Sequence, residues 1–170
     1  FKTSYLTLYS DNFRKLKMIR VPRQDLAILL LNGPNLNLLG SREQDIYGRC
    51  SLGSLVSDLE GFANSFGVTL THMQSNAEHV LIEAIHSTQE NGIDFVIINP
   101  GAYGHTSIAI RDAFLAIQVP FIEVHISNTS AREEFRHKSY LTDIAKGTIS
   151  GFGIYSYELA LQAAIKISQN

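Results

Sequence analysis

The segment FIEVHIS at residues 121–127 places a carboxylate, an imidazole and a hydroxyl at every second position. In an extended strand this period puts Glu123, His125 and Ser127 on one side and turns the two aliphatic residues between them to the other. A carboxylate beside an imidazole fixes the tautomer of the ring and favours its protonated form, so the pair can act as a general acid. A satisfied structural histidine is the alternative for this segment.

Tyr47, five residues after Arg42, supplies a candidate for the matching base. A phenol with a pKa of about 10 is ionised roughly one part in a thousand at pH 7, and half-ionisation requires about 4 kcal/mol. A nearby guanidinium and partial exclusion of water supply free energy of that kind. The sequence therefore predicts Tyr47 as a base only together with Arg42. Arg136 is either a further cationic ligand or a solvated helix charge.

These residues follow predicted strands. An apolar run at 27–31 ends abruptly at Asn32-Gly33-Pro34-Asn35, which is typical of a buried strand in a parallel sheet. The next segment is longer than an ordinary strand-to-helix loop, and it carries Gly40 and Gly48 as hinges. A long hinged loop at the carboxyl end of a central strand is where an open α/β sheet places its ligand, a merely irregular connection being the alternative.

Hydrophobic periodicity predicts five strands alternating with helices along the chain. The expected strands are 27–31, 68–73, 93–98, 121–124 and 148–152, and the expected helices are 51–66, 77–91, 106–118 and 155–167, with a short charged helical turn at 131–136. This alternation predicts an α/β fold, a flavodoxin-like three-layer sandwich with a five-stranded parallel sheet of order 2-1-3-4-5 and helices on both faces. Three polar clusters, at 35–47, 99–107 and 123–127, then converge on one rim.

Composition excludes several other classes. The chain has 170 residues, 45% of them hydrophobic, and a formal charge of −2, which argues against nucleic acid or an anionic membrane as partner. No apolar run is long enough to span a membrane. A single cysteine, Cys50, excludes an internal disulfide and favours a reducing compartment, the cytoplasm. Glycine-rich phosphate loops and metal-ligand histidine spacings are absent from the sequence, so we expect no cofactor and no metal.

Residues 1–24 differ from the remainder in charge. They hold six Lys or Arg and one acid, whereas the rest of the chain holds 8 basic and 15 acidic residues. We interpret residues 1–24 as a basic N-terminal extension that results from the position at which translation is taken to begin. On this interpretation, Met18 is the natural start. A cleavable transit peptide is the weaker alternative. Residues 25–170 then form a single catalytic domain.

Several long motifs occur in order without large gaps, from about residue 26 to residue 167. They are NGPNLNLLGSRE at 32–43, YG at 47–48, NPGAY at 99–103, HTS at 105–107, RDA at 111–113, FIEVHISN at 121–128 and AREEFR at 131–136. In these motifs the chain resembles the type II 3-dehydroquinate dehydratases. The resemblance implies elimination of water from 3-dehydroquinate to give 3-dehydroshikimate, through an enolate, with anti stereochemistry and without cofactor or metal.

The resemblance also implies residue roles. Tyr47, as phenolate, accepts the proton from carbon 2, and Arg42 lowers its pKa and stabilises the transition state. Asn35 holds a water that stabilises the enolate oxygen. His125, oriented by Glu123, protonates the departing hydroxyl on carbon 1.

Further implied contacts hold the substrate. The ring hydroxyls are bound by Asn99, His105 and Arg136, and the carboxylate by the backbone N–H groups of Ile126 and Ser127. Asp112 reaches the site of a neighbouring subunit, which implies trimers that assemble to a dodecamer. The sequence departs from the family pattern at Gln44, where proline is common, and at Thr129-Ser130, where valine and histidine are usual.

Two alternatives stay open at this point. A Schiff-base route to the same product needs an activated lysine, and the lysines beyond residue 24 are Lys138, Lys146 and Lys166, none on an apolar strand. A flavodoxin-like binding or scaffold module is not excluded by composition. The reaction serves both aromatic biosynthesis and quinate breakdown, and the sequence does not distinguish them.

Overall fold

The computed structural model describes residues 26–41 and 50–169. Within these residues the centre is a five-stranded parallel sheet of order β2-β1-β3-β4-β5, which confirms the predicted order. The strands are β1 (Ala27–Asn32), β2 (Thr69–Gln74), β3 (Phe95–Asn99), β4 (Phe121–His125) and β5 (Gly147–Ser150). Asn32 pairs with Asn99, so the polar ends of β1 and β3 lie side by side.

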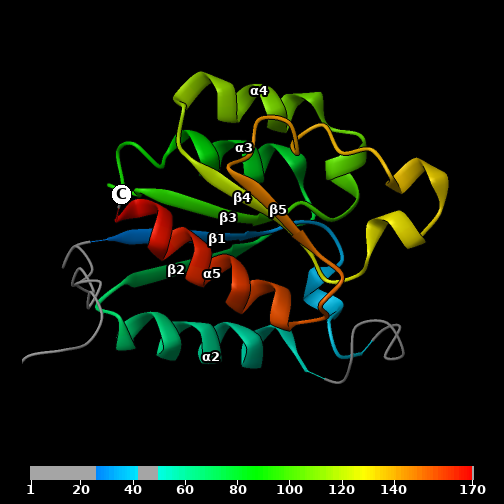
Figure 1. The fold of residues 1–170 in the computed structure, drawn as a ribbon. Coiled ribbons are helices and arrows are strands. Elements are labelled where there is room, and N and C mark those ends of the chain that lie inside the picture. The colour runs from blue at the N-terminus through cyan, green and yellow to red at the C-terminus, as the bar shows by residue number, and fades with distance from the viewer. Residues whose placement is uncertain (1–25, 42–49, 170) are drawn as a thin grey trace, which may run out of the picture.

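Helices cover both faces of the sheet. Figure 1 shows α2 and α5 on one face and α3 and α4 on the other, which is the predicted three-layer arrangement. The helices are α2 (Leu52–Ser65), α3 (Glu78–His86), α4 (Ile108–Ile117) and α5 (Tyr155–Ser168).

Strands β1 and β3, in the interior of the sheet, are buried on both sides. Alternate residues turn to opposite faces, so Leu30 and Ile97 pack with α2 and α5, while Leu31 and Ile98 pack with α3 and α4. A strand covered on both faces needs apolar residues at every position, which is why β1 and β3 appear as continuous apolar runs rather than alternating ones.

One predicted helix is too long. α3 ends at His86, not at 91, because Ser87 and Thr88 bind the carbonyls of its last turn with their own side chains. The Ser87 hydroxyl donates to Ala84 O at 3.0 Å, and the Thr88 hydroxyl donates to Ile85 O at 2.7 Å. Such side-chain bonds compete with the next helical hydrogen bonds and favour a turn.

Short 3-10 turns form much of the rim. The predicted helical turn at 131–136 is instead two turns, η3 (Thr129–Ala131) and η4 (Glu134–Arg136), because Arg132 between them has an extended backbone. Two others are η1 (Leu36–Leu38) after β1 and η2 (Gly101–His105) after β3. All four lie beyond the carboxyl ends of strands, the edge at which polar clusters were predicted to meet.

Two predicted features lie outside the described residues, namely the extension 1–24 and the segment 42–49 with Arg42 and Tyr47. In the part of the chain that is described, the helices are too short or too polar to cross a bilayer.

Candidate active site

The carboxyl end of β4 carries a buried acid–imidazole pair. Glu123 is 0% exposed and His125 is 7% exposed. The two side chains point to the same side of the strand, as the period of two predicts, and His125 Nε2 lies 2.8 Å from Glu123 Oε1. A histidine whose Nε2 donates to a carboxylate keeps Nδ1 for proton exchange with a ligand.

Glu123 is held as an anion. Burial alone would raise the pKa of this carboxyl group, but hydrogen bonds from His125, Ser139 and Thr142, together with attraction to the His125 ring, outweigh burial and lower the pKa. The anion accepts from His125 Nε2 and so fixes the orientation of the ring. The Nδ1 atom of His125 is then left for exchange with a ligand in the pocket.

A second imidazole lies against the first. The His105 ring, at the end of η2, stacks on the His125 ring with centroids 5.9 Å apart and an interplanar angle of 17°. His105 Nδ1 lies 2.8 Å from the backbone carbonyl of Lys138, so Nδ1 carries a hydrogen and Nε2 is the acceptor of the neutral ring. This arrangement suits a bond from a ligand hydroxyl to His105 Nε2.

Asn99, at the end of β3, is oriented by a buried hydrogen-bonded chain. Its Nδ2 donates to the Tyr157 hydroxyl at 2.7 Å, and that hydroxyl donates to Asn32 Oδ1, also at 2.7 Å. Asn99 Oδ1 accepts from the backbone N–H of Gly101 at 3.2 Å. Burial raises the pKa of Tyr157, so the hydroxyl stays neutral and keeps its donor. The Asn99 amide is therefore fixed in one orientation.

The turn after β1 forms the opposite wall of the pocket. Gly33 packs directly on the backbone of the Asn99–Pro100 turn, where an added Cβ would lie 2.3 Å from Pro100 O. Asn35 has a positive φ of 67°, a conformation that asparagine tolerates better than most residues, and its N–H donates to Asn76 Oδ1 at 2.9 Å. The turn fixes the backbone of Asn35 while its side chain stays exposed.

Two arginines supply positive charge. Arg132 Nε and Arg136 Nε both donate to Glu133 Oε2, at 3.3 and 2.9 Å. Arg132 Nη1 also lies 3.5 Å from Ser127 Oγ, just after β4. Their side chains are about one quarter exposed. Both side chains line the pocket, and a guanidinium group can bind an anionic or hydroxylated ligand.

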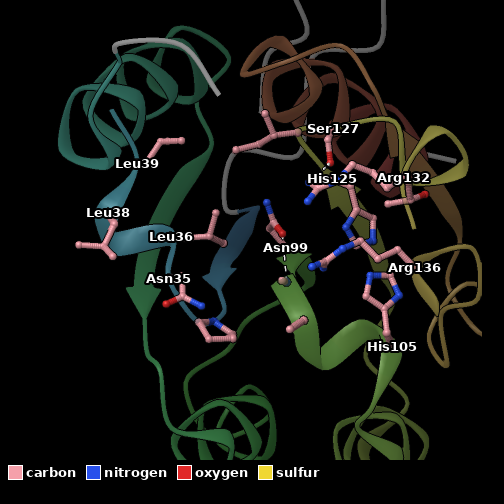
Figure 2. A pocket seen from close by; sticks show the side chains of 15 residues that line it. Asn35, Leu36, Leu38, Leu39, Asn99, His105, His125, Ser127, Arg132 and Arg136 are labelled. Atoms are coloured by element: carbon pink, nitrogen blue, oxygen red, sulfur yellow. Dashed lines mark hydrogen bonds between the residues drawn. The ribbon is translucent and has the colours of Figure 1, made fainter. Parts of the chain in front are cut away.

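Together these elements line one pocket, shown in Figure 2, with Asn35 and three leucines on one side, His105, His125 and the two arginines on the other, and Asn99 between. The predicted site residues that line it are Asn35, Asn99, His105, His125, Ile126, Ser127 and Arg136. Glu123 lies behind His125.

Glu123 and Asp112 are the predicted site residues within the described chain that do not line the pocket. Asp112 lies on α4 and is exposed, away from the pocket lining. Arg42 and Tyr47 lie outside the described residues, so their roles stay predictions.

Sequence reasoning missed several site residues. Arg132 lines the pocket, and its signal was the spacing of four residues to Arg136, with Glu133 placed to bind both. Leu36, Leu38 and Leu39 also line it, and apolar residues in a loop otherwise rich in polar ones were the available signal. No local pattern pointed to Tyr157, which meets Asn32 across 125 residues of sequence.

The pocket combines a buried acid, an amide and two cationic side chains around a small concave space. Such a set can bind a compact anionic ligand with several hydroxyls and transfer a proton to one of them.

Comparisons with known proteins agree with this chemistry. The family model described as dehydroquinase class II matches residues 26–165. The chain is 58% identical over 141 residues to a 3-dehydroquinate dehydratase of Erwinia tasmaniensis, covering 83% of this chain and 93% of the relative. It is 59% identical over 138 residues to a 3-dehydroquinate dehydratase of Yersinia enterocolitica, covering 81% and 91%. The crystal structure of type II dehydroquinase from Butyrivibrio crossotus matches with a TM-score of 0.80 at 41% identity, covering 86% of this chain and 99% of that one. This chain therefore belongs to the dehydroquinase class II family.

Proposed function

We propose that this protein is a hydro-lyase that converts 3-dehydroquinate to 3-dehydroshikimate. The observation that carries the proposal is the Glu123–His125 pair at the pocket, with Nε2 and Oε1 2.8 Å apart, in a chain nearly 60% identical to named 3-dehydroquinate dehydratases. The reaction is an anti elimination of water through an enolate, and it uses no cofactor and no metal.

The acid step belongs to His125. As imidazolium, it donates a proton to the departing hydroxyl on carbon 1, while Glu123 keeps Nε2 protonated and orients the ring. The low exposure of both side chains supports this role, because a water-poor site strengthens the electrostatic interaction between them.

The base step belongs to Tyr47, which removes the proton from carbon 2 as phenolate. Arg42 stabilises the phenolate and the developing charge, and a water on Asn35 stabilises the enolate oxygen. The support is positional, since Leu39 lines the pocket and the segment that carries Arg42 and Tyr47 follows Ser41 directly.

Substrate contacts divide between two kinds of group. Side chains that end in donors or acceptors bind the ring hydroxyls, and the backbone N–H groups that follow β4 bind the carboxylate. The hydroxyl contacts are Asn99, His105 and Arg136, and the carboxylate contacts are Ile126 and Ser127, all of which line the pocket.

We extend the proposal to assembly and location. The protein forms trimers that assemble to a dodecamer, with Asp112, exposed on α4, reaching a neighbouring subunit. It acts in the cytoplasm, as its single cysteine suggests, and residues 1–24 precede one catalytic domain, 25–170. The product enters either aromatic biosynthesis or quinate breakdown.

The direct test is the rise in ultraviolet absorbance of the conjugated product when 3-dehydroquinate is added. We expect activity in the parent and a loss of about 10²- to 10⁴-fold in Tyr47→Phe, because the base is removed. Tyr155→Phe, at an exposed position at the start of α5, is the matched control and should match the parent.

Three results would contradict parts of this proposal. An inactive parent would indicate a binding protein on this fold. An active parent with an active Tyr47→Phe would keep the reaction and remove Tyr47 as its base. A borohydride-trapped adduct with substrate would indicate a Schiff-base route instead.

A further inference from the structure

Two hydroxyl groups from one distant segment converge on the carboxylate of Glu123. The Ser139 hydroxyl donates to Oε1 and the Thr142 hydroxyl donates to Oε2, each at 2.6 Å. With His125 Nε2 on Oε1, both oxygens of a side chain that is 0% exposed have a hydrogen-bond donor. A buried carboxylate without such donors favours its neutral form.

The segment that carries these hydroxyls is held firmly. Arg111, on α4, donates to the backbone carbonyl of Tyr140 at 2.7 Å and forms a two-point ion pair with Asp143. The Tyr140 N–H donates to Gly104 O at 2.8 Å, and the Leu141 side chain is 0% exposed. The segment from residue 139 to residue 143 is thus tied to α4, to η2 and to the core.

The local bonds also set the direction of the hydroxyl proton. Ser139 Oγ accepts from the backbone N–H of Leu141 at 3.1 Å, so its own hydrogen is directed to Glu123. Gly104 permits close packing here, because an added Cβ would lie 2.9 Å from Pro100 Cγ and 3.4 Å from Glu123 Oε1. The carboxylate therefore has little freedom to rotate away from His125.

We propose that Ser139 and Thr142 are positioning residues that lock the Glu123 carboxylate against His125 Nε2 and so keep the acid of the reaction correctly oriented and charged. Neither hydroxyl lines the pocket, so each acts through Glu123 and not on the substrate. The role rests on the proposed function, in which His125 is the proton donor.

Among the residues that the structure describes, few charged groups act on the Glu123 carboxylate. Within the described residues, His125 on β4 is the charged partner that acts on Glu123 directly. His105 on η2 stacks on the His125 ring, and the Arg111–Asp143 pair holds the other end of the segment. A change at Thr142 or Ser139 therefore reports on Glu123 itself.

The test compares Thr142→Val, which removes the hydroxyl but keeps the shape, with Thr142→Ser, which keeps the hydroxyl. Loss of one hydrogen bond to a charged group is large enough to change a rate constant about tenfold. We therefore expect Thr142→Val to lower kcat about tenfold with little change in KM. The acid limb of the pH–activity profile should move up by about one pH unit, because Glu123 loses a donor to its ionised form. Thr142→Ser should restore both.

Ser139→Ala removes the other hydroxyl group that donates to Glu123. It is the test variant if Thr142→Val does not fold. Thr69→Val, at an exposed position of the edge strand β2, is the matched control and should leave the profile unchanged. A kcat and acid limb equal to those of the parent in both Thr142→Val and Ser139→Ala would overturn the proposal. Equal losses in Thr142→Ser and Thr142→Val would also overturn it, since packing and not the hydroxyl would be responsible.

A second readout does not depend on turnover. Titration of carboxyl-labelled glutamate by carbon-13 NMR, with Glu123→Gln to assign the resonance, should show a higher pKa for Glu123 in Thr142→Val than in the parent. If the parent fails to convert 3-dehydroquinate, the proposed function is wrong. The titration still tests whether Ser139 and Thr142 hold the Glu123 carboxylate in its ionised form. If Glu123 titrates in Thr142→Val as it does in the parent, and the parent is active, the positioning role is wrong and the proposed function stands.

Discussion

The carboxyl ends of β4 and β1 form opposite walls of the same pocket, and they are built on different principles. At β4, Glu123 and His125 are buried and fixed by side-chain hydrogen bonds. At β1, the backbone of Gly33 packs on the next turn, and Asn35 and Leu38 beyond it are exposed. Control of a proton needs exclusion of water, whereas entry of a ligand needs an accessible wall.

The largest effect should come from breaking the buried wall. His125→Ala removes the proposed acid and should lower kcat by about 10²- to 10⁴-fold with the fold intact, measured by product absorbance and circular dichroism. Asn35→Ala, on the exposed wall, should lower kcat less than His125→Ala does, because Asn35 is proposed to act through a water. A larger loss in Asn35→Ala than in His125→Ala would reverse the assignment of the two walls.

Gly33→Ala breaks the backbone wall. The added Cβ would meet Pro100 O at 2.3 Å, so the two turns must separate, and we expect the free energy of unfolding to fall by about 1–3 kcal/mol in urea denaturation. Gly53→Ala, where a Cβ meets nothing within 4 Å, is the control and should not destabilise the protein. Equal stability of Gly33→Ala and the parent would show that the turns are not packed as described.

The smallest effect concerns pH and sharpens the contrast. The pKa of Glu123 is lowered in the folded protein, so the folded state binds its proton less readily than the unfolded chain does. The resulting stabilisation is present above the ordinary value of 4.5 and is lost as the pH falls through the folded pKa. The difference in unfolding free energy between the parent and Glu123→Gln should therefore shrink on acidification. A difference independent of pH would contradict an ionised, hydrogen-bonded Glu123.

Local patterns accounted for much of the fold and part of the site. The continuous apolar runs of β1 and β3 indicated strands covered on both faces, and alternation along 121–127 indicated that Glu123 and His125 share a side. Both inferences need only the period of a strand. The predicted end of α3 was wrong. The hydroxyl groups of Ser87 and Thr88 bond to carbonyls of the last helical turn, and this depends on the side-chain rotamers that the two residues adopt in the folded protein.

The sequence by itself determined the order of elements, the rim at which polar residues gather, and the pairing of an acid with an imidazole two residues away. Only the tertiary structure decided which distant groups complete that site. Ser139 and Thr142 reach Glu123 across 16 and 19 residues of chain, and Tyr157 orients Asn99 across 58. Periodicity fixes neighbours along one element, whereas such contacts depend on how separate elements pack, and no local pattern encodes them.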